Sequence, residues 1–303
     1  MVSDYCRNVI DIMKQGCYFD YVMSAGSELD RVKQFLRAMA GQIELPRPHK
    51  LQYPTYPCFP GLSHQPFHDR GNFPGVKILE DNIGLIRQEL AGLRRQYYAD
   101  YSPRGKNIMI GSGENLLSER PIENWSLYLL YYVGVDIDFE NRFPETKTLI
   151  RALPNVCLDY PWGDALFSLH APGAHLPAHC SIDNLRVRTH LGIEIPDESA
   201  IRVGVEERRW KAGECLVFED SFEHEVWNRA DSSRLVLIVD FWHPDLTKAE
   251  QEVLTAGFLK SDVRLSFYKY RLSNTTVPKD YYPLVEKIIM DQDEDEVIRK
   301  YWS

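Results

Sequence analysis

Two histidines in this chain have the spacing and surroundings expected of metal ligands. His179 and His224 lie 45 positions apart, each beside sequence that favours β-strands. Iron(II) accepts imidazole nitrogen, and a catalytic iron must keep coordination positions open, so a few protein ligands on a rigid β scaffold suit it. Many non-haem iron oxygenases add a carboxylate two residues after the first histidine, but Ser181 occupies that position here. His179 and His224 are the best candidates for iron ligands, and Ser181 leaves the third position unexplained; the alternative is a pair of ordinary half-buried histidines.

Arg234 stands at the start of an apolar run that extends from Leu235 to Val239. A charge at such a position is costly unless an anion partners it, and the planar guanidinium fork suits a carboxylate well. An oxoacid bound to the metal has a distal carboxylate that this arginine could neutralise. The alternative is a solvated arginine in the turn before the strand.

A second group of cationic residues alternates along the run from 186 to 195. Arg186, Arg188 and His190 therefore share one face of a predicted strand, and Ser168 and His170 form a similar pair on another. A face with several positive groups favours anions, although a strand face turned to solvent gives the same pattern. Together with Arg234, Arg188 and His190 predict a clamp for an oxoacid.

The region that contains these residues has the pattern of an all-β structure. Short β-prone runs alternate there with turn residues such as Pro172-Gly173, and His179 falls in a loop between two runs. This spacing predicts a sandwich or barrel rather than a sheet built of βαβ units. The predicted strands are Ala165–His170, Arg186–Ile195, Ile201–Val205, Cys215–Phe218, His224–Asn228 and Leu235–Trp242.

Helices are predicted on either side of the β region. Residues 3–41 have apolar side chains at helical spacing, and we expect one or two helices there to pack against a sheet. A further helix is expected from Leu79 to Tyr97, with Glu80 and Asp81 in its first turn. Seven prolines between 46 and 74 exclude a helix, but the aromatic residues among them favour an ordered, wrapped segment. The remaining expected elements are an alternating stretch at 125–135, a short helix at 143–146 and a helix from 247.

The whole chain has the composition of a globular protein. Its 303 residues are 44% hydrophobic, enough for a substantial core. We expect a single domain over 1–303, with a mostly helical, Pro-rich layer over 1–100, a β core over about 120–246 and a helical extension over 247–303.

Charge and cysteine usage restrict the partners and the compartment. The net charge of −9 argues against a nucleic-acid partner. The N-terminus does not resemble a signal peptide, and no stretch is long and apolar enough to span a membrane, so we expect a cytoplasmic protein. Six dispersed cysteines without a CxxC pair favour free thiols, although their even number leaves a secreted protein open.

The segment from 168 to 244 resembles the aspartyl/asparaginyl β-hydroxylase family. This resemblance implies an iron(II)- and 2-oxoglutarate-dependent dioxygenase that is mainly β with flanking helices, built on a double-stranded β-helix of the jelly-roll, cupin-like kind. Weaker similarity extends upstream to Phe59. The most specific matching strings are Phe218-Glu219-Asp220-Ser221-Phe222-Glu223-His224-Glu225-Val226-Trp227 and Val239-Asp240-Phe241-Trp242-His243-Pro244-Asp245-Leu246, with shorter ones at 170–173, 184–192 and 210–214.

Matching positions imply a role for each site residue. Arg186 would face the carboxylate of the acceptor. Some members of the family have only two histidine ligands, with water in the third place, and Ser181 puts this chain among them. Asp220 would then hold that water. The remaining implied roles are iron binding by His179 and His224, and 2-oxoglutarate binding by Ser168, Arg188, His190 and Arg234, with Trp125 lining that pocket.

The implied reaction is hydroxylation of the β-carbon of an aspartyl or asparaginyl residue, or of a related small acid. Dioxygen and 2-oxoglutarate would be co-substrates, and succinate and carbon dioxide would be released. Two alternatives stay open: the same chemistry on a lipid acyl chain or a secondary metabolite, and a β-barrel that binds an oxoacid without turnover. The expected partner is a small molecule, a peptide or a protein, and the sequence does not set the oligomeric state. Side chains that choose the acceptor are expected partly in segments 46–74 and 104–123.

Overall fold

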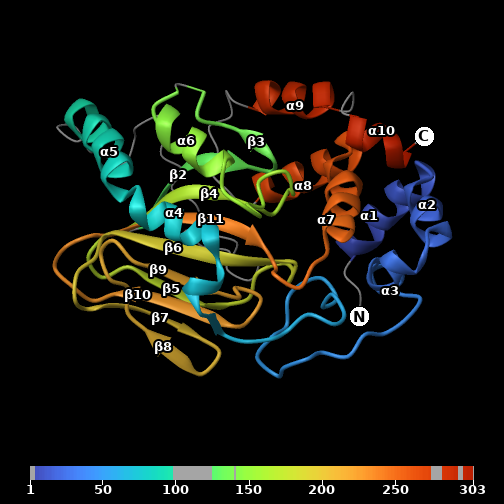
Figure 1. Ribbon diagram of the computed structural model, residues 1–303, viewed down its shortest axis with the longest axis horizontal. Coiled ribbons are helices and arrows are strands. Elements are labelled where there is room, and N and C mark those ends of the chain that lie inside the picture. Colours follow the sequence, from blue (N-terminus) through green and yellow to red (C-terminus); the bar gives the residue numbers. More distant parts are fainter. Residues whose placement is uncertain (1–3, 98–124, 140, 274–281, 293–295, 303) are drawn as a thin grey trace.

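Two antiparallel sheets form the centre of the computed structural model, which describes residues 4–97, 125–139, 141–273, 282–292 and 296–302. The strands are β1 (Phe67–His68), β2 (Trp125–Tyr132), β3 (Val135–Asp136), β4 (Ala165–His170), β5 (His175–His179), β6 (Arg186–Glu194), β7 (Ser199–Val203), β8 (Glu206–Arg208), β9 (Cys215–Phe218), β10 (His224–Asn228) and β11 (Arg234–Trp242). The larger sheet has the order β1-β9-β6-β11-β4-β2-β3, and the smaller has the order β5-β10-β7-β8. From β4 to β11, successive strands alternate between the sheets apart from the β7–β8 hairpin, with the smaller sheet below the larger in Figure 1. This alternation is that of a double-stranded β-helix, as predicted.

Strand β11 illustrates how the sequence places side chains in two layers. It lies between β6 and β4, and all nine of its residues are buried. Val236 and Ile238 belong to the core between the sheets, while Leu237 and Val239 belong to the core on the opposite face. That opposite face is covered by α4 (Pro74–Asp81), α5 (Ile83–Tyr97) and α6 (Pro144–Arg151). Arg234, at the start of this strand, is therefore a charge inside an apolar structure.

The predicted strands are confirmed, and the structure adds β1, β5 and β8, which the sequence pattern did not show. Strands β4, β9 and β10 have the predicted bounds, and β6, β7 and β11 differ from them by at most two residues. Of the added strands, β5 carries a site residue, and we expected it to be part of a loop. It is short and contains Pro177, which is tolerated because β5 lies at the edge of the smaller sheet. His179 consequently ends a strand instead of lying in a loop.

The helix expected from Leu79 to Tyr97 is two helices. Helix α4 begins at Pro74, where a proline's fixed φ suits the first turn, and α5 begins after Asn82. The Asn82 side chain donates to the carbonyl oxygen of Ile78, which caps the end of α4. Glu80 and Asp81 therefore close one helix instead of opening another. The helix predicted at 143–146 is confirmed as α6.

The N-terminal helices pack mainly against other helices, which corrects the expectation that they cover a sheet. They form one layer with the C-terminal helices, and both chain ends lie in this layer in Figure 1. Val9 and Phe35 share a core with Leu254 and Phe258 of the C-terminal helices. The helices of this layer are α1 (Asp4–Gln15), α2 (Tyr18–Ser24), α3 (Asp30–Met39), α7 (Lys248–Leu259), α8 (Ser261–Ser273) and α10 (Glu296–Trp302). Helix α9 (Tyr282–Asp291) packs against α8 and β3, and short 3-10 turns lie at Ser27–Leu29 and Arg70–Asn72.

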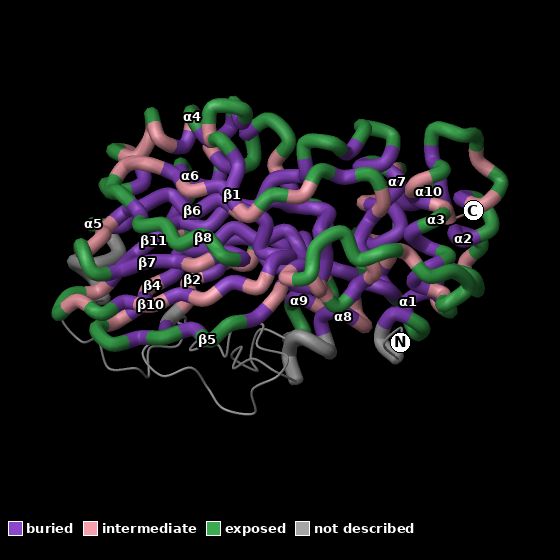
Figure 2. Tube along the Cα trace, turned by 90° about the horizontal axis from the view of Figure 1, so that it is seen from below, coloured by how far each residue is buried: buried purple, intermediate pink, exposed green. Residues whose placement is uncertain are grey.

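The Pro-rich segment is ordered and wraps along the β core, as predicted. The Tyr56 N–H donates to the carbonyl oxygen of Ile182 over 2.8 Å, and the Phe59 N–H donates to Asn184 Oδ1 over 2.7 Å. Figure 2 shows the buried trace running through the sheets and the helical layer, with exposed residues along the outer loops. The segment 104–123, where we expected some acceptor-selecting residues, lies outside the described residues.

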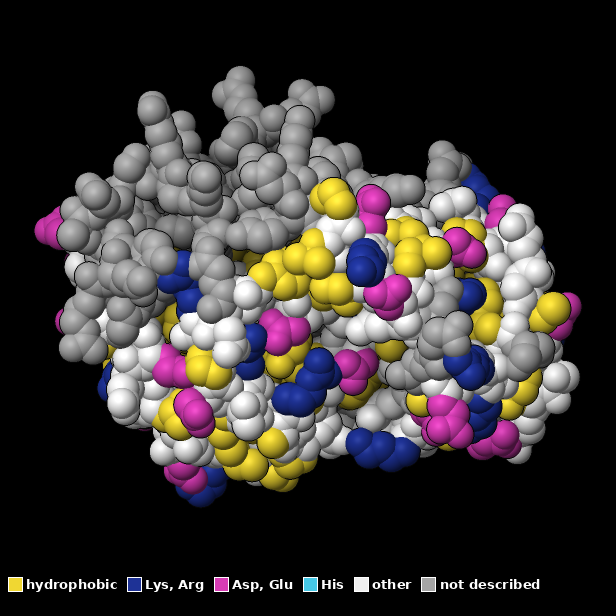
Figure 3. Space-filling model, turned by 90° about the horizontal axis from the view of Figure 1, so that it is seen from above, with side chains coloured by type: hydrophobic (Ala, Val, Ile, Leu, Met, Phe, Trp, Pro, Cys, Tyr) yellow, Lys and Arg dark blue, Asp and Glu magenta, His cyan; other side chains and the backbone are white. Residues whose placement is uncertain are grey.

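Two further features concern the whole surface and the cysteines. Basic and acidic side chains are interspersed among the coloured residues of the face in Figure 3, in line with the net charge of −9. No helix in the described part of the chain is long and apolar enough to cross a membrane. All six cysteines are free thiols, as predicted.

Candidate metal and oxoacid site

The two predicted metal ligands lie side by side at the ends of neighbouring strands. His179 ends β5 and His224 begins β10, and the antiparallel register places them opposite each other. Their ring centroids are 4.1 Å apart, and their exposed fractions are 9% and 5%. The fold thus brings together two imidazoles that are distant in sequence, at a position with little access for water.

Hydrogen bonds hold both imidazoles in the tautomer that a metal ligand needs. His179 Nδ1 lies 2.8 Å from the carbonyl oxygen of Pro177, and His224 Nδ1 lies 2.9 Å from that of Phe222. A carbonyl oxygen only accepts, so each Nδ1 carries the hydrogen and each Nε2 carries the lone pair. Burial, reinforced by the neighbouring His179, lowers the pKa of His224 well below its ordinary value. A neutral ring with its lone pair on Nε2 is the form that binds a divalent metal.

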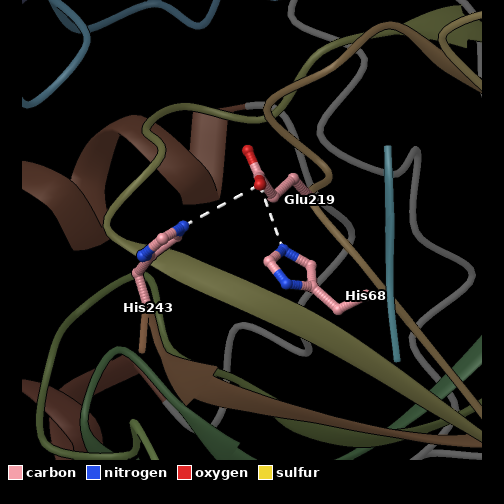
Figure 4. Close-up of side chains that lie close together, drawn as sticks. All are labelled: His68, Glu219 and His243. Carbon is pink, nitrogen blue, oxygen red and sulfur yellow. Dashed lines mark hydrogen bonds and ion pairs between the residues drawn. The ribbon is translucent and has the colours of Figure 1, made fainter. Parts of the chain in front are cut away.

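A second cluster has metal-binding residue types with different hydrogen bonding. His68, Glu219 and His243 are buried, and Figure 4 shows both imidazoles directed at the carboxylate. Glu219 Oε1 lies 3.0 Å from His68 Nε2 and 3.8 Å from His243 Nε2. Burial alone would raise the pKa of Glu219, but the two imidazoles and the backbone N–H of Gln65 outweigh it and hold that pKa below its ordinary value. An ionised carboxylate only accepts, so His68 Nε2 is a donor.

A backbone hydrogen bond gives His243 the same tautomer as His68, with the hydrogen on Nε2. The Asp245 N–H donates to His243 Nδ1 over 3.2 Å, which leaves the hydrogen of the neutral ring on Nε2. Both Nε2 atoms in this cluster therefore carry hydrogens where a metal needs lone pairs. Gln52 Nε2 also donates to Glu219 Oε2 over 2.9 Å. We interpret the cluster as a hydrogen-bonded network that fastens the Pro-rich segment to the turn between β9 and β10.

Arg234 is a buried cation whose donors lack partners. It is 1% exposed, and within the described part of the chain its Nε and Nη1 have no hydrogen-bond partner. Its Cζ lies 4.6 Å from the ring centroid of Trp210, a cation–π contact. Burial lowers the pKa of Arg234, because the charged form has lost its hydration. Such an arrangement requires an anion, and a carboxylate would satisfy it.

His190 connects this cation to the histidine pair. Its ring stacks on Trp210, with centroids 5.9 Å apart and planes 14° apart, and Phe218 lies 4.8 Å from it on another side. Phe218 in turn lies 6.0 Å from His224. Burial, and then the charge of Arg234, lowers the pKa of His190 well below its ordinary value. Neither of its ring nitrogens has a hydrogen-bond partner among the described residues, so both are available to a ligand.

Three further candidate residues lie on β4, which pairs with β11, and on β2, which pairs with β4. Trp125 Nε1 donates to Ser168 Oγ over 2.9 Å, and both side chains are buried. His170 lies opposite Arg234 in the strand register and makes an edge contact with Trp125. The sequence reasoning had not assigned His170 or Trp210 a role, although each lies in a string that carries the family resemblance.

Arg188 is held by a carboxylate on the neighbouring strand. Its Nε and Nη2 donate to the two oxygens of Asp240 over 2.9 and 2.8 Å. Burial alone would raise the pKa of Asp240, but Arg186 and Arg188 outweigh it and keep that pKa below its ordinary value. Asp240 was not predicted as a site residue because its role depends on the register that places it opposite Arg188. Nη1 is the guanidinium nitrogen that these two bonds leave for a ligand.

Arg186 is buried among oxygen atoms of its own chain, and its role at the acceptor's carboxylate stays a prediction. Its side chain is 0% exposed. Nη1 donates to Asp220 Oδ2 over 2.7 Å, and Nη2 donates to Ser181 Oγ over 2.6 Å. The reason is local: the His179–Asn184 loop and the β9–β10 turn both fold over this strand and supply oxygen atoms to the guanidinium.

Comparison with known proteins identifies relatives among hydroxylases. The family model described as aspartyl/asparaginyl beta-hydroxylase matches residues 80–244. Human aspartyl/asparaginyl beta-hydroxylase is 37% identical over 201 residues, which cover 65% of this chain and 25% of that protein. The ornithine lipid ester-linked acyl 2-hydroxylase of Rhizobium tropici is 31% identical over 189 residues, 60% of this chain and 62% of that protein. The chain therefore matches about a quarter of the length of the human relative.

Two solved structures match part of the chain. TT1209 from Thermus thermophilus is 23% identical with a TM-score of 0.23, covering 27% of this chain and 74% of that one. A predicted oxalate decarboxylase from Thermotoga maritima is 11% identical with a TM-score of 0.26, covering 39% of this chain and 80% of that one.

Proposed function

The chain belongs to the aspartyl/asparaginyl beta-hydroxylase family, and on that premise we propose that it is an iron(II)- and 2-oxoglutarate-dependent dioxygenase. His179 and His224 would hold the iron, and the pocket around Arg234 would hold the co-substrate. When bound, iron(II) with 2-oxoglutarate and dioxygen supplies the oxidising power for hydroxylating an unactivated carbon, with succinate and carbon dioxide as co-products.

The observation that carries this proposal is the contrast between the two histidine clusters. In one, carbonyl acceptors at both Nδ1 atoms leave lone pairs on Nε2 of His179 and His224. In the other, a carboxylate and a backbone donor put hydrogens on Nε2 of His68 and His243. Only the first pair is prepared for a metal.

The residues around Arg234 fit a dicarboxylate. The unpartnered Nε and Nη1 of Arg234 would donate to its distal carboxylate, which restores the counter-ion that burial demands. Ser168 would donate its hydroxyl hydrogen to the same group, because its oxygen already accepts from Trp125. His190 and Arg188 Nη1 would contact the end nearer the metal, and burial would keep bulk water away from the reacting atoms.

The first candidate acceptor is the β-carbon of an aspartyl or asparaginyl residue, or of a related small acid. The human relative's name supports it, and 37% identity through the matched region supports a shared site. The second candidate is an acyl chain, and it is favoured by the Rhizobium tropici relative, whose name gives an acyl 2-hydroxylase. We propose the same use of the metal and the oxoacid for both acceptors.

Release of succinate from 2-oxoglutarate tests the proposal. Protein with iron(II) should form succinate, faster when the acceptor is an aspartyl or asparaginyl peptide than when it is an acyl lipid. His224→Ala should abolish this release, whereas His68→Ala, which changes the other cluster, should retain it. If wild-type protein neither binds 2-oxoglutarate nor forms succinate with either acceptor, the proposed function is wrong.

A further inference from the structure

Three residues near the histidine pair form a bridge of buried contacts. Ser181 follows His179 by two positions, and Asp220 precedes His224 by four. Arg186 lies between them on β6 and reaches both, with 2.6 Å to Ser181 Oγ and 2.7 Å to Asp220 Oδ2. The exposed fractions of the three residues are 2%, 0% and 0%. The guanidinium therefore joins the segment after one histidine to the segment before the other.

Two further contacts close this bridge. The Ser181 backbone N–H donates to the backbone carbonyl oxygen of Asp220 over 2.8 Å, so the two segments are also joined directly. Arg186 Nη1 lies 3.3 Å from Asp240 Oδ2, which anchors the guanidinium to β11. A planar fork with fixed donor directions suits a bridge of this kind, whereas a lysine offers a single point of attachment.

We propose that Arg186 is a positioning residue that ties Ser181 to Asp220 and thereby fixes the relative placement of His179 and His224. The proposal rests on the proposed function in taking those histidines as the metal ligands. It stands beside the role at the acceptor that the family resemblance implied, which stays a prediction. Orientation of ligands by buried hydrogen-bonded partners is a general requirement of metal sites.

The bridge also explains what position 181 can do. The Ser181 hydroxyl points at Arg186, 2.6 Å from Nη2. A carboxylate introduced there would meet a guanidinium before it could reach a metal, and the charge-assisted bond would hold it. Ser181→Asp therefore does not complete a site of two histidines and one carboxylate in this chain.

The first test uses cobalt(II) as the probe, with its visible spectrum as a readout of coordination. Ser181→Asp should bind cobalt(II) within about threefold of the wild-type affinity and with an unchanged spectrum. A gain of tenfold or more with a new spectrum would show that the carboxylate binds the metal, and would overturn the proposal.

The second test changes the bridge itself. Arg186→Gln and Arg186→Lys should each weaken cobalt(II) binding about tenfold. Arg202→Gln is the matched control: Arg202 contacts Glu223 and Glu225, on either side of His224, but it does not join the two segments. That variant should bind as wild type does. If both Arg186 variants keep the cobalt(II) affinity and spectrum of wild type and lose only acceptor binding, Arg186 binds the acceptor and does not position the histidines.

A third test uses the metal-free protein and does not depend on whether the Arg186 variants fold. Ser181→Ala removes one contact of the bridge and keeps its charges. In NMR spectra of the metal-free protein, the contact between the rings of His179 and His224 should be strong in wild type and weaker in Ser181→Ala. An identical contact in both proteins would count against the bridge. If wild-type protein shows this ring contact but binds no cobalt(II), the proposed function fails while the role of Arg186 is still decided by the NMR comparison.

Discussion

Arg234 is expected to lower the stability of the ligand-free protein and to be required for ligand binding. Its charge is buried and two of its donors are unsatisfied, so the ligand-free fold bears a desolvation cost that a methionine of similar length would remove. We expect Arg234→Met to be at least as stable as wild type without ligand, and to lose 2-oxoglutarate binding. In wild type, a ligand at a hundred times its Kd should add about 2.7 kcal/mol to the free energy of unfolding. Thermal unfolding with and without 2-oxoglutarate checks both statements; a ligand-induced rise in the variant equal to that of wild type would contradict them.

Three buried histidines predict an acid-sensitive metal-free protein. Burial holds the pKa values of His170, His190 and His224 well below the ordinary value of 6.5. Below about pH 6.5 the unfolded chain therefore binds protons that the native protein does not, so stability falls as the pH falls, by about 1.4 kcal/mol per histidine per pH unit. Urea unfolding at about pH 7.5 and about pH 5.5, on either side of the ordinary histidine pKa, measures this loss in the free energy of unfolding.

The histidine contribution can be separated from that of the carboxylates. His170→Leu removes one of the three titrating groups, whose Nδ1 has no partner in the described part of the chain, and should reduce the loss by about 1.4 kcal/mol at one pH unit below 6.5. His49→Gln substitutes an exposed histidine instead and should leave the loss unchanged. Equal acid sensitivity in all three proteins would show that other groups are responsible.

At the residue scale, the sequence indicated which residue types form the site but not which side chains they contact. Arg234 could be recognised because a charge before five apolar residues is unusual and implies an anion. The partners of Arg186 could not, since Ser181 and Asp220 come from two separate loops that meet only in the folded chain. Their contacts follow from cross-strand register, which a single sequence does not specify.

At the scale of elements, hydrogen bonds to Glu219 connect the Pro-rich segment to the β9–β10 turn. It accepts hydrogen bonds from Gln52, from the Gln65 N–H and from His68. Its pKa is held below the ordinary value, so this stabilisation is present near neutral pH and is lost in acid as the carboxylate protonates. Glu219→Gln replaces an acceptor with a group that carries donors, and should cost about 3 kcal/mol.

Hydrogen exchange locates the effect of that substitution. Amides of residues 51–68 should exchange faster in Glu219→Gln, because the segment loses its buried attachment. Glu206→Gln removes an exposed ion pair with Arg208 and should cost less than about 1 kcal/mol. Faster exchange confined to other regions would contradict the fastening role.

Periodicity predicted the long elements well and the short ones poorly. The apolar runs of β4 and β11 are nearly continuous because both strands are buried on both faces of the larger sheet. By contrast, β5 contains Pro177 at an edge, and its side chains do not alternate cleanly. The end of α4 at Asn82 was missed for another reason. The apolar pattern continues through this position, and the helix end is marked only by the hydrogen bond from the Asn82 side-chain amide to the Ile78 carbonyl oxygen.

At the scale of the whole molecule, the C-terminal helix α10 is held to the N-terminal helices by contacts within the helical layer. Trp302 stacks on Tyr18 with ring centroids 5.1 Å apart, and its Nε1 donates to the Ala256 carbonyl oxygen. Trp302→Ala should lower the free energy of unfolding by about 2 kcal/mol, less than for a fully buried tryptophan. Because these contacts are distant in the fold from His179 and His224, cobalt(II) affinity should not change. A parallel loss of affinity and stability would show that the two layers are coupled.

The β core could be predicted as a whole because turn residues divide it into short runs. The packing of the N-terminal helices could not, since an amphipathic helix shows which of its faces is buried but not what covers it. The C-terminal helices that cover them come more than two hundred positions later in the chain, with Tyr18 Oη donating to the Val253 carbonyl oxygen as one such contact.

Metal titration of matched variants tests the central claim most directly. Cobalt(II) should bind wild-type protein at one site, and the double substitution His68→Ala with His243→Ala should leave that affinity unchanged. His179→Ala and His224→Ala should each weaken binding about a hundredfold or more, because each removes one of the two protein ligands. Undiminished binding in both of these variants, with loss of binding in the His68/His243 variant, would contradict the assignment of the site.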